Sequence, residues 1–133
     1  MLSRDLQRVI SDVGQLWECA TSLAVDPKDA SVPAPLGAHL SFILGEAISN
    51  AVRHGGASTI KVGIRKTDKQ LAIEIHDNGR GINGSTNEYD HEQLADGDLG
   101  PVSLRERVAE LGGSLRVRSS PLGTELQMRV PLG

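Results

Sequence analysis

Residues 36–54 read LGAHLSFILGEAISNAVRH, and this stretch carries the strongest helical pattern in the chain. Its apolar side chains recur every three or four residues, the spacing that puts them on one face of an α-helix. These positions are Leu40, Ile43, Leu44, Ala47, Ile48, Ala51 and Val52. Gly55 and Gly56 follow directly, as glycines do at helix C-termini. The stretch therefore predicts a helix with one face buried in a core.

Two pairs of β-strands are predicted after this helix. Residues 58–65 and 70–76 alternate apolar and polar side chains, and the link KTDK between them predicts an antiparallel hairpin. Near the C-terminus, SLRVRSS (114–120) and TELQMRVPL (124–132) repeat this pattern around the turn PLG. Because both pairs are joined by short links, a mostly antiparallel sheet is expected.

The remaining segments complete a single domain of 133 residues. Residues 3–18 predict an amphipathic N-terminal helix, 19–25 a strand, and 101–111 a helix with Pro101 in its first turn. Residues 77–100 hold five glycines and predict a long structureless connection, which is usually functional or mobile. This order indicates an α+β fold: a two-layer sandwich with helices on one face of a mixed sheet. The other face is expected to be partly open or covered by a neighbour.

Composition excludes several classes of protein. The net charge is −3, whereas proteins that grip nucleic acid by its phosphates usually show a basic excess. Aromatic residues make up 2% of the chain, too few for base-stacking platforms, and the single cysteine excludes an internal disulfide. No apolar run approaches the roughly 20 residues that span a bilayer. A cytoplasmic domain without nucleic-acid or direct membrane contact is expected, although a longer parent protein can be membrane-anchored.

A polar row interrupts the apolar pattern of the 36–54 helix. Glu46, Asn50 and His54 are spaced by four residues and share one face, with Arg53 beside them. Oxygen-bearing side chains suit Mg²⁺, which keeps water and phosphate oxygens in its shell. The row is therefore a candidate site for magnesium and phosphate. An ordinary solvated helix face explains the same residues about equally well.

Two glycine-containing turns are the other candidates. DNGRGI (77–82) follows a predicted strand directly, so Asp77 is placed to accept a hydrogen bond from an exocyclic amine such as that of adenine. GDLGP (97–101) precedes a helix, whose N-terminal N–H groups suit phosphate. Either segment taken alone also fits a plain turn. Neither is a P-loop or a dinucleotide-binding glycine motif.

Taken together and in this order, these segments resemble a known family. EAISNAVRH (46–54) resembles the N box of the histidine-kinase ATPase family, whose Bergerat fold is shared with DNA gyrase, MutL and the Hsp-type chaperones. DNGRGI resembles the first glycine box of that family. SLRERVAELGGSL (103–115) resembles the segment after the second glycine box in NarL/DesK-like sensor kinases, and SSPLGTEL (119–126) resembles their final box. The likeness covers residues 36–132.

The resemblance implies an ATP-dependent protein histidine kinase with specific residue roles. Asn50 coordinates Mg²⁺, and Glu46 acts as a base or holds a metal-bound water. The remaining implied contacts are Arg53, His54 and Gly100 near the phosphates, Asp77 on the adenine amine, Gly79 and Gly81 shaping the pocket, Ile82 beside the base, and the Thr124 hydroxyl supporting the adenine pocket. Residues 83–99 correspond to the ATP lid.

Two departures from the family pattern leave alternatives open. Asp98 stands where the second glycine box usually has glycine, and a carboxylate there would repel a triphosphate. The predicted helix at 3–18 contains no histidine, so the resemblance implies a phosphoacceptor on a separate dimerisation domain, in a longer parent or in trans, with a response regulator downstream. The alternatives are an anti-sigma-type serine kinase of the same clan and a non-catalytic nucleotide-binding or docking module.

Overall fold

The computed structural model describes residues 2–79, 87–89, 102–120 and 122–132. The helices in these ranges are α1 (Leu2–Leu16), α2 (Ala34–Gly55) and α4 (Val102–Glu110). The strands are β1 (Ala20–Asp26), β2 (Thr59–Lys66), β3 (Gln70–Asp77), β4 (Asn87–Tyr89), β5 (Ser114–Ser120) and β6 (Gly123–Pro131).

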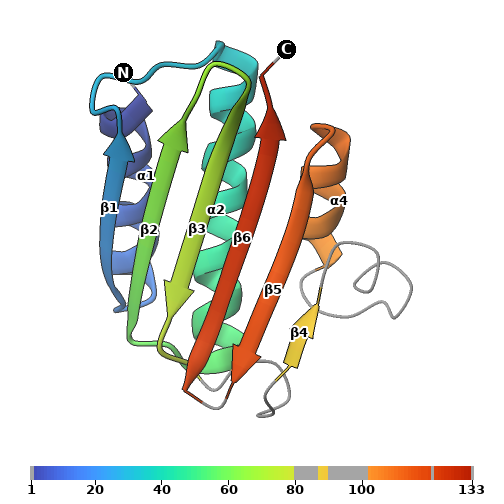
Figure 1. Cartoon of the computed structure of the whole chain (residues 1–133). Helices are drawn as coiled ribbons and strands as arrows, with labels where there is room; N and C mark the ends of the chain where they lie inside the picture. Colours follow the sequence, from blue (N-terminus) through green and yellow to red (C-terminus); the bar gives the residue numbers. More distant parts are fainter. Residues whose placement is uncertain (1, 80–86, 90–101, 121, 133) are drawn as a thin grey trace.

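The described strands form one mixed sheet in the order β1-β2-β3-β6-β5-β4 (Figure 1). β1 pairs with β2 in parallel, and the other neighbours pair antiparallel. β6 lies between β3 and β5, so the two predicted hairpins are joined side by side in the centre of the sheet. The predicted α+β class and the mostly antiparallel sheet are confirmed.

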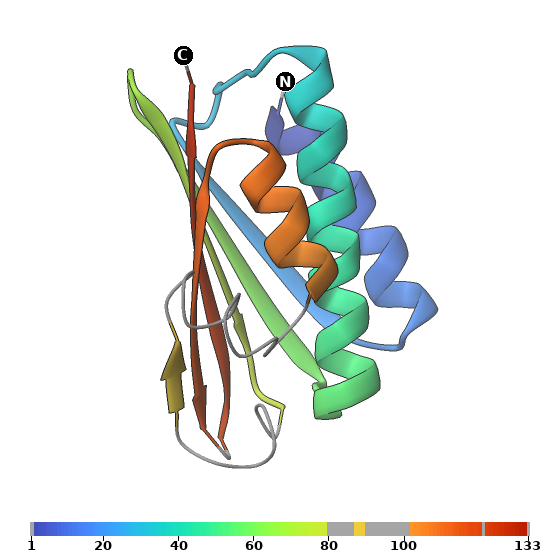
Figure 2. The same ribbon diagram turned by 90° about the vertical axis from the view of Figure 1, so that its right-hand side faces the viewer.

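The three described helices cover the same face of the sheet (Figure 2). Apolar side chains of the central strands alternate with polar ones and point to this helical layer, as period-two patterning requires. One apolar row across the sheet is set by strand register and consists of Val62, Ile75, Leu126 and Val117. α2 lies over this row with Leu40, Ile43, Leu44 and Ile48 fully buried. The two-layer arrangement is therefore the predicted one.

The ends of α1 and α2 follow from local backbone groups. α2 ends where Gly56 adopts a left-handed conformation with φ 67°, so the expected glycine stop is confirmed. α1 stops at Leu16, two residues before the predicted end, because Glu18 has φ 54° and the chain turns there. The N–H of Cys19 then donates to the Gly14 carbonyl at 2.8 Å. No helix in the described ranges is both long and apolar enough to cross a membrane.

The expectation of a wholly structureless connection over 77–100 is wrong at Asp77, the last residue of β3, and at three residues further along the chain. Asn87–Tyr89 form β4, which pairs antiparallel with β5 through Asn87 and Ser119, Glu88 and Arg118, and Tyr89 and Val117. The edge of β5 offered unpaired backbone groups, and a short strand satisfies them. The rest of the predicted lid at 83–99 lies outside the described residues, so its role stays a prediction.

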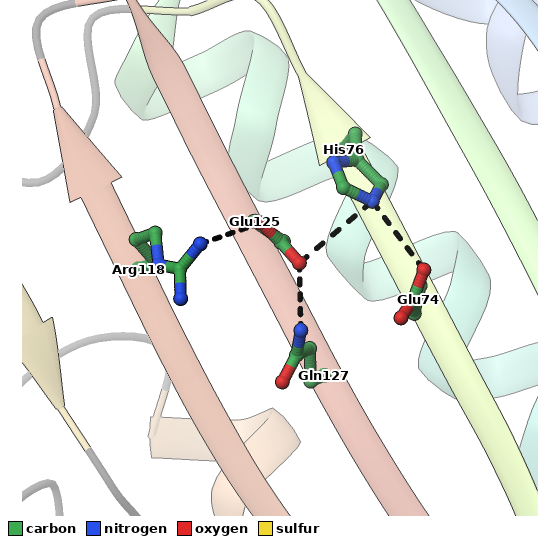
Figure 3. Close-up of polar contacts among 5 residues, drawn as sticks. All are labelled: Glu74, His76, Arg118, Glu125 and Gln127. Carbon is green, nitrogen blue, oxygen red and sulfur yellow. Dashed lines mark hydrogen bonds and ion pairs between the residues drawn. The ribbon is translucent and has the colours of Figure 1, made fainter.

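The face of the sheet away from the helices is polar. Glu125 on β6 lies at its centre, where it accepts a 2.7 Å hydrogen bond from Gln127 Nε2 and pairs with Arg118 at 3.7 Å (Figure 3). His76 on β3 lies 3.9 Å from Glu125 and 3.6 Å from Glu74. Glu125 is 20% exposed, whereas Glu74, His76 and Arg118 are about half exposed or more, so these groups form a partly solvated polar surface.

Candidate functional site

The C-terminal half of α2 carries the predicted polar row. Glu46 and Asn50 are half-buried and one helical turn apart, Arg53 is exposed, and His54 belongs to the last turn of the helix. No hydrogen bond or ion pair joins the side chain of Glu46 or Asn50 to another residue in the described ranges. Both side chains thus carry oxygen acceptors that have no partner among the described residues.

The second candidate segment begins at the last residue of β3. Asp77 Oδ1 accepts hydrogen bonds from the backbone N–H of Gly79 at 2.8 Å and of Thr124 at 3.3 Å. No residue in the described part of the chain donates to the other oxygen, Oδ2. Among the described residues the carboxyl group is therefore held through Oδ1 alone.

Burial raises the pKa of the Asp77 carboxyl, because a low-dielectric surrounding disfavours its charged form. The hydrogen bonds from Gly79 and Thr124 and the charge of His76 work against this shift and only partly offset it. Asp77 also contributes to the raised pKa of the buried Cys19 thiol, after burial itself. A strand-end carboxyl with a raised pKa inside a cluster of backbone amides is typical of a functional position.

Close backbone approaches bring three elements together at this point. A Cβ added at Gly79 would lie 2.8 Å from the carbonyl oxygen of Gly55, the last residue of α2. A Cβ added at Gly123, which has φ 150°, would lie 2.0 Å from the Asp77 carbonyl oxygen. Any side chain at either position would push β3 away from its neighbours. The end of α2, the end of β3 and the start of β6 therefore meet at Asp77.

The structure gives Thr124 a different contact from the one expected. The resemblance assigned its hydroxyl to the pocket, whereas the described contact is made by its backbone N–H, which helps to hold Asp77. Thr124 is directly opposite Asp77 in the β3–β6 register. The role of the hydroxyl in the adenine pocket remains a prediction.

Several predicted site residues cannot be placed. Gly81, Ile82 and Gly100 lie outside the described residues, as does Asp98.

α4, which follows them, runs antiparallel to α2, so its N-terminal end points toward the end of the molecule that holds Asn50 (Figure 2). The Arg107 guanidinium fixes α4 on α2: it lies 3.9 Å from the centroid of the Phe42 ring and 3.4 Å from His39 Nδ1.

Sequence reasoning missed two features of this cluster. Asn78 was interpreted only as part of a turn, but its side chain bonds to the chain at Ser58 and Thr59. Gly123 was expected only as a turn residue, but it allows β6 to lie against Asp77. The D-N-G pattern marks a turn, and it carries no information on which distant backbone an asparagine side chain will reach.

Sequence comparisons relate the chain to known proteins. Residues 37–133 match the profile of a family described as "Histidine kinase-, DNA gyrase B-, and HSP90-like ATPase". The chain is 36% identical over 90 residues to the sensor histidine kinase NarS of Mycobacterium tuberculosis, which covers 68% of this chain and 20% of that protein. It is 32% identical over 106 residues to the sensor protein VraS of Staphylococcus aureus, covering 79% of this chain and 28% of VraS.

Solved structures extend the likeness to nearly the whole chain. The ATP binding domain of PrrB from Mycobacterium tuberculosis is 27% identical, has a TM-score of 0.70, and the match covers 98% of this chain and 93% of that one. The histidine kinase domain of a blue-light activated kinase from Erythrobacter litoralis has a TM-score of 0.73 at 24% identity, with 98% and 61% covered. At that identity the second likeness shows the fold alone.

Proposed function

Because the chain belongs to the family of histidine kinase-, DNA gyrase B- and HSP90-like ATPases, we propose that it is the ATP-binding catalytic domain of a sensor histidine kinase. In this proposal it transfers the γ-phosphoryl group of ATP, with Mg²⁺, to a histidine on a separate dimerisation domain. The observation that carries the proposal is the Asp77 carboxyl, which the described residues hold through Oδ1 and not through Oδ2, together with Glu46 and Asn50 of α2, which have no partner among those residues.

Asp77 supplies the base-recognition half of the proposal. A carboxylate oxygen without a partner is an acceptor for the exocyclic amine of adenine, and a half-buried position strengthens that bond relative to water. Gly79 shapes this part of the pocket, since its missing side chain lets the turn lie against the end of α2. Gly81, Ile82 and the Thr124 hydroxyl are proposed to complete the wall around the base.

The α2 row supplies the phosphate half. Among the described residues no three His, Cys, Asp or Glu side chains gather into a metal cluster. That agrees with an ion carried by the triphosphate, because Mg²⁺ usually takes few protein ligands and keeps phosphate and water oxygens. Asn50 Oδ1 is proposed as the direct ligand and Glu46 as a water-mediated one, and the bound ion neutralises phosphate charge. Arg53, His54 and Gly100 are proposed to contact the phosphates.

The proposed reaction depends on positioning more than on covalent chemistry by the protein. An imidazole nitrogen of the acceptor histidine attacks the γ-phosphorus, the bond to the bridging oxygen breaks, and ADP leaves with that oxygen. The proton on the other ring nitrogen goes to a base, for which Glu46 is the proposed group. Half-burial of Glu46 keeps the carboxylate available without a competing partner among the described residues.

The partners of the domain follow from the same proposal. The chain spans 20% of NarS and 28% of VraS, so a whole sensor kinase contains much more than this domain. The histidine-bearing dimerisation domain, in cis or in trans, and a response regulator are therefore proposed as partners. The NarL/DesK-like branch is proposed on the SLRERVAELGGSL segment. The two sensor-protein relatives favour histidine over serine as the acceptor.

Calorimetry with ATP, in the presence and absence of Mg²⁺, tests the binding half of the proposal. We expect saturable binding that weakens strongly without the ion, and amide shifts around residues 50 and 79 in an NMR titration. Addition of the histidine-bearing domain of the parent protein and radiolabelled ATP then tests transfer. Binding without transfer would favour the non-catalytic module, and unchanged amide spectra at saturating nucleotide would contradict the proposal.

A further inference from the structure

The side chain of Asn78 ties the Asp77 turn to the segment that follows α2. Its Oδ1 accepts hydrogen bonds from the backbone N–H of Ser58 at 2.8 Å and of Thr59 at 3.0 Å. Its Nδ2 donates to Ser58 Oγ at 2.9 Å, and its own N–H donates to the Thr59 carbonyl at 3.3 Å. Within the described ranges the hydrogen bonds of this side chain thus go to two consecutive residues, Ser58 just before β2 and Thr59 at its start.

These bonds lie just beyond the end of regular strand pairing. The last β2–β3 partners are Ile60 and Asp77, so Asn78 is the first residue past the ladder. Without the Asn78 side chain, the backbone N–H groups of Ser58 and Thr59 would lose their hydrogen-bond acceptor on the β3 side. The Asn78 side chain therefore continues the pairing of β2 and β3 by one more step, although the backbone has already begun to turn.

The position of Asp77 depends on this extension. β6 holds the carboxyl through the Thr124 N–H, at a long 3.3 Å, and the turn holds it through the Gly79 N–H. Gly79 follows Asn78 directly, so the bonds of Asn78 to Ser58 and Thr59 help to hold the turn in place. A rotation of the turn would move Oδ1 off the Gly79 N–H and redirect Oδ2.

We propose that Asn78 is a positioning residue for base recognition: by fixing the turn to Ser58–Thr59, it aims Asp77 Oδ2 and so sets the preference for an amino-purine over an oxo-purine nucleotide. The inference rests on the proposed function, since it assigns Asp77 Oδ2 to the purine amine. Asn78 itself touches no nucleotide in this account. Its effect reaches the ligand only through the direction of the Asp77 carboxyl.

Nucleotide selectivity separates this role from a merely structural one. ATP carries an amine at the purine 6-position, and inosine triphosphate carries an oxygen there, with the same ribose and phosphates. A loss of folded protein lowers binding of both nucleotides equally and leaves their ratio unchanged. A misdirected Asp77 carboxyl weakens ATP more than inosine triphosphate, because only adenine offers an amine donor at the 6-position; inosine has an oxygen there, and its nearest donor is the N1–H. The measured quantity is therefore the ratio of the two dissociation constants.

The experiment titrates Mg·ATP and Mg·inosine triphosphate into the wild-type chain and its variants by calorimetry. We expect Asn78→Ala to lower the preference for ATP by about five- to tenfold, since it removes the hydrogen bonds that hold the turn. Asn78→Asp keeps both acceptor bonds, and the Ser58 hydroxyl can turn to donate, so the ratio should be restored. Ser58→Ala removes one bond of three and should lower the ratio by about twofold.

Thr67→Ala is the matched control. Thr67 Oγ1 accepts from the Gln70 N–H at 3.2 Å and donates to the Gln70 carbonyl at 3.1 Å, which fixes the turn at the opposite end of the same two strands. This variant should cost comparable stability and leave the nucleotide ratio at its wild-type value. An equal fall for both nucleotides in Asn78→Ala, or no fall at all, would overturn the inference.

Two further results separate this inference from the proposed function. Should Asn78→Ala fail to fold, an unchanged ratio in the well-folded Ser58→Ala variant overturns the inference by itself. A wild-type chain that binds both nucleotides equally contradicts the proposed role of Asp77, and this is seen before any Asn78 variant is made. If Asp77→Asn loses the preference for ATP over inosine triphosphate and Asn78→Ala keeps it, the proposed function holds and the positioning role of Asn78 is wrong.

Discussion

The two sides of the candidate site differ in how far folding alone satisfies their polar groups. On the β3 side, Asp77 and Asn78 bond to backbone groups of β2, the turn and β6. On the α2 side, Glu46 and Asn50 are half-buried and bond to no other described residue. The first side is thus assembled by the fold, and the second has acceptors without a partner in the described part of the chain.

Because of this difference, the two sides suit different parts of nucleotide binding. A group already held in place loses little freedom when a ligand arrives, so the β3 side suits selection of the base. Unpartnered half-buried oxygens carry a desolvation cost that a cation can relieve, so the α2 side suits metal-dependent binding. We expect substitutions on α2 to affect ion-dependent steps most and substitutions on β3 to affect base recognition most.

The largest effect is expected from Asn50→Ala. Loss of the direct oxygen ligand should lower Mg-dependent ATP turnover by about 100-fold or more, as removal of one stabilising group at a reacting phosphate does. The fold should remain intact, because alanine is the better helix former and Asn50 has no described partner to lose. Steady-state hydrolysis and calorimetry with and without Mg²⁺ measure the two effects.

Ser41→Ala is the control for this variant, because it removes a half-buried polar group nine residues earlier on the same helix. It should leave both turnover and affinity unchanged. Unaltered Mg·ATP affinity and turnover in Asn50→Ala would contradict the metal-dependent role proposed for the α2 side.

A smaller effect is expected from Asp77→Asn. The amide oxygen can still accept from Gly79 and Thr124, but the position of Oδ2 is then taken by an NH2 group, which is a donor and cannot accept from the adenine amine. ATP affinity should fall by about tenfold or more, the usual difference for a charge-assisted hydrogen bond. Thermal melts should show little or no loss of stability. Parallel losses in the melt and in binding would indicate that Asp77 serves the fold.

The pH dependence of stability offers an independent test of the same residue. Because the folded chain has the higher Asp77 pKa, it holds the proton more tightly than the unfolded chain does. The contribution of Asp77 to the free energy of unfolding therefore falls as the pH rises from the ordinary pKa of an aspartate to the raised pKa of the folded state. Below and above this interval the contribution does not change with pH. Asp77→Asn removes this slope, so its stability relative to wild type should grow across that interval. Urea midpoints measured from acid to neutral pH give the difference, and a constant or shrinking difference would contradict it.

The smallest effect is expected on the open face of the sheet. Glu74→Gln breaks the 3.6 Å pair with His76, but both side chains are about half exposed. Such pairs contribute less than about 1 kcal/mol, since water replaces the interaction. Denaturant unfolding should register at most this change, and Mg·ATP affinity should stay at its wild-type value. A clear loss of Mg·ATP affinity would indicate that the nucleotide site includes this face of the sheet.

Local sequence patterns predicted most elements of the fold. The apolar spacing at 36–54 gave a helix within two residues of α2, and alternation gave both hairpins, because burial on one face imposes these periods directly. β4 was not predicted: a three-residue strand has no detectable period and forms only where the edge of β5 is open. The insertion of β6 between β3 and β5 was likewise outside the reach of periodicity.

The candidate site was predictable in part for the same reason. Glu46 and Asn50 share a helix face by spacing alone, and Asp77 is marked by its place between a strand and a glycine turn. The bonds from Asn78 to Ser58 and Thr59 cross 20 and 19 positions of sequence, so no local pattern reports them. The close fit of Gly79 to Gly55 and of Gly123 to Asp77 likewise exists only between elements packed together.

The sequence by itself determined which faces are apolar, where the chain turns, and which residue types are offered for a nucleotide and its ion. These properties are local, because they depend on side-chain chemistry and on helix and strand periods of a few residues. Only the tertiary structure decided that the end of α2, the end of β3 and the start of β6 meet at Asp77. The packing of these elements also decided that, among the described residues, backbone N–H groups bond to Asp77 Oδ1 and not to Oδ2. Hydrogen bonds between distant segments form only after packing has brought them within about 3 Å.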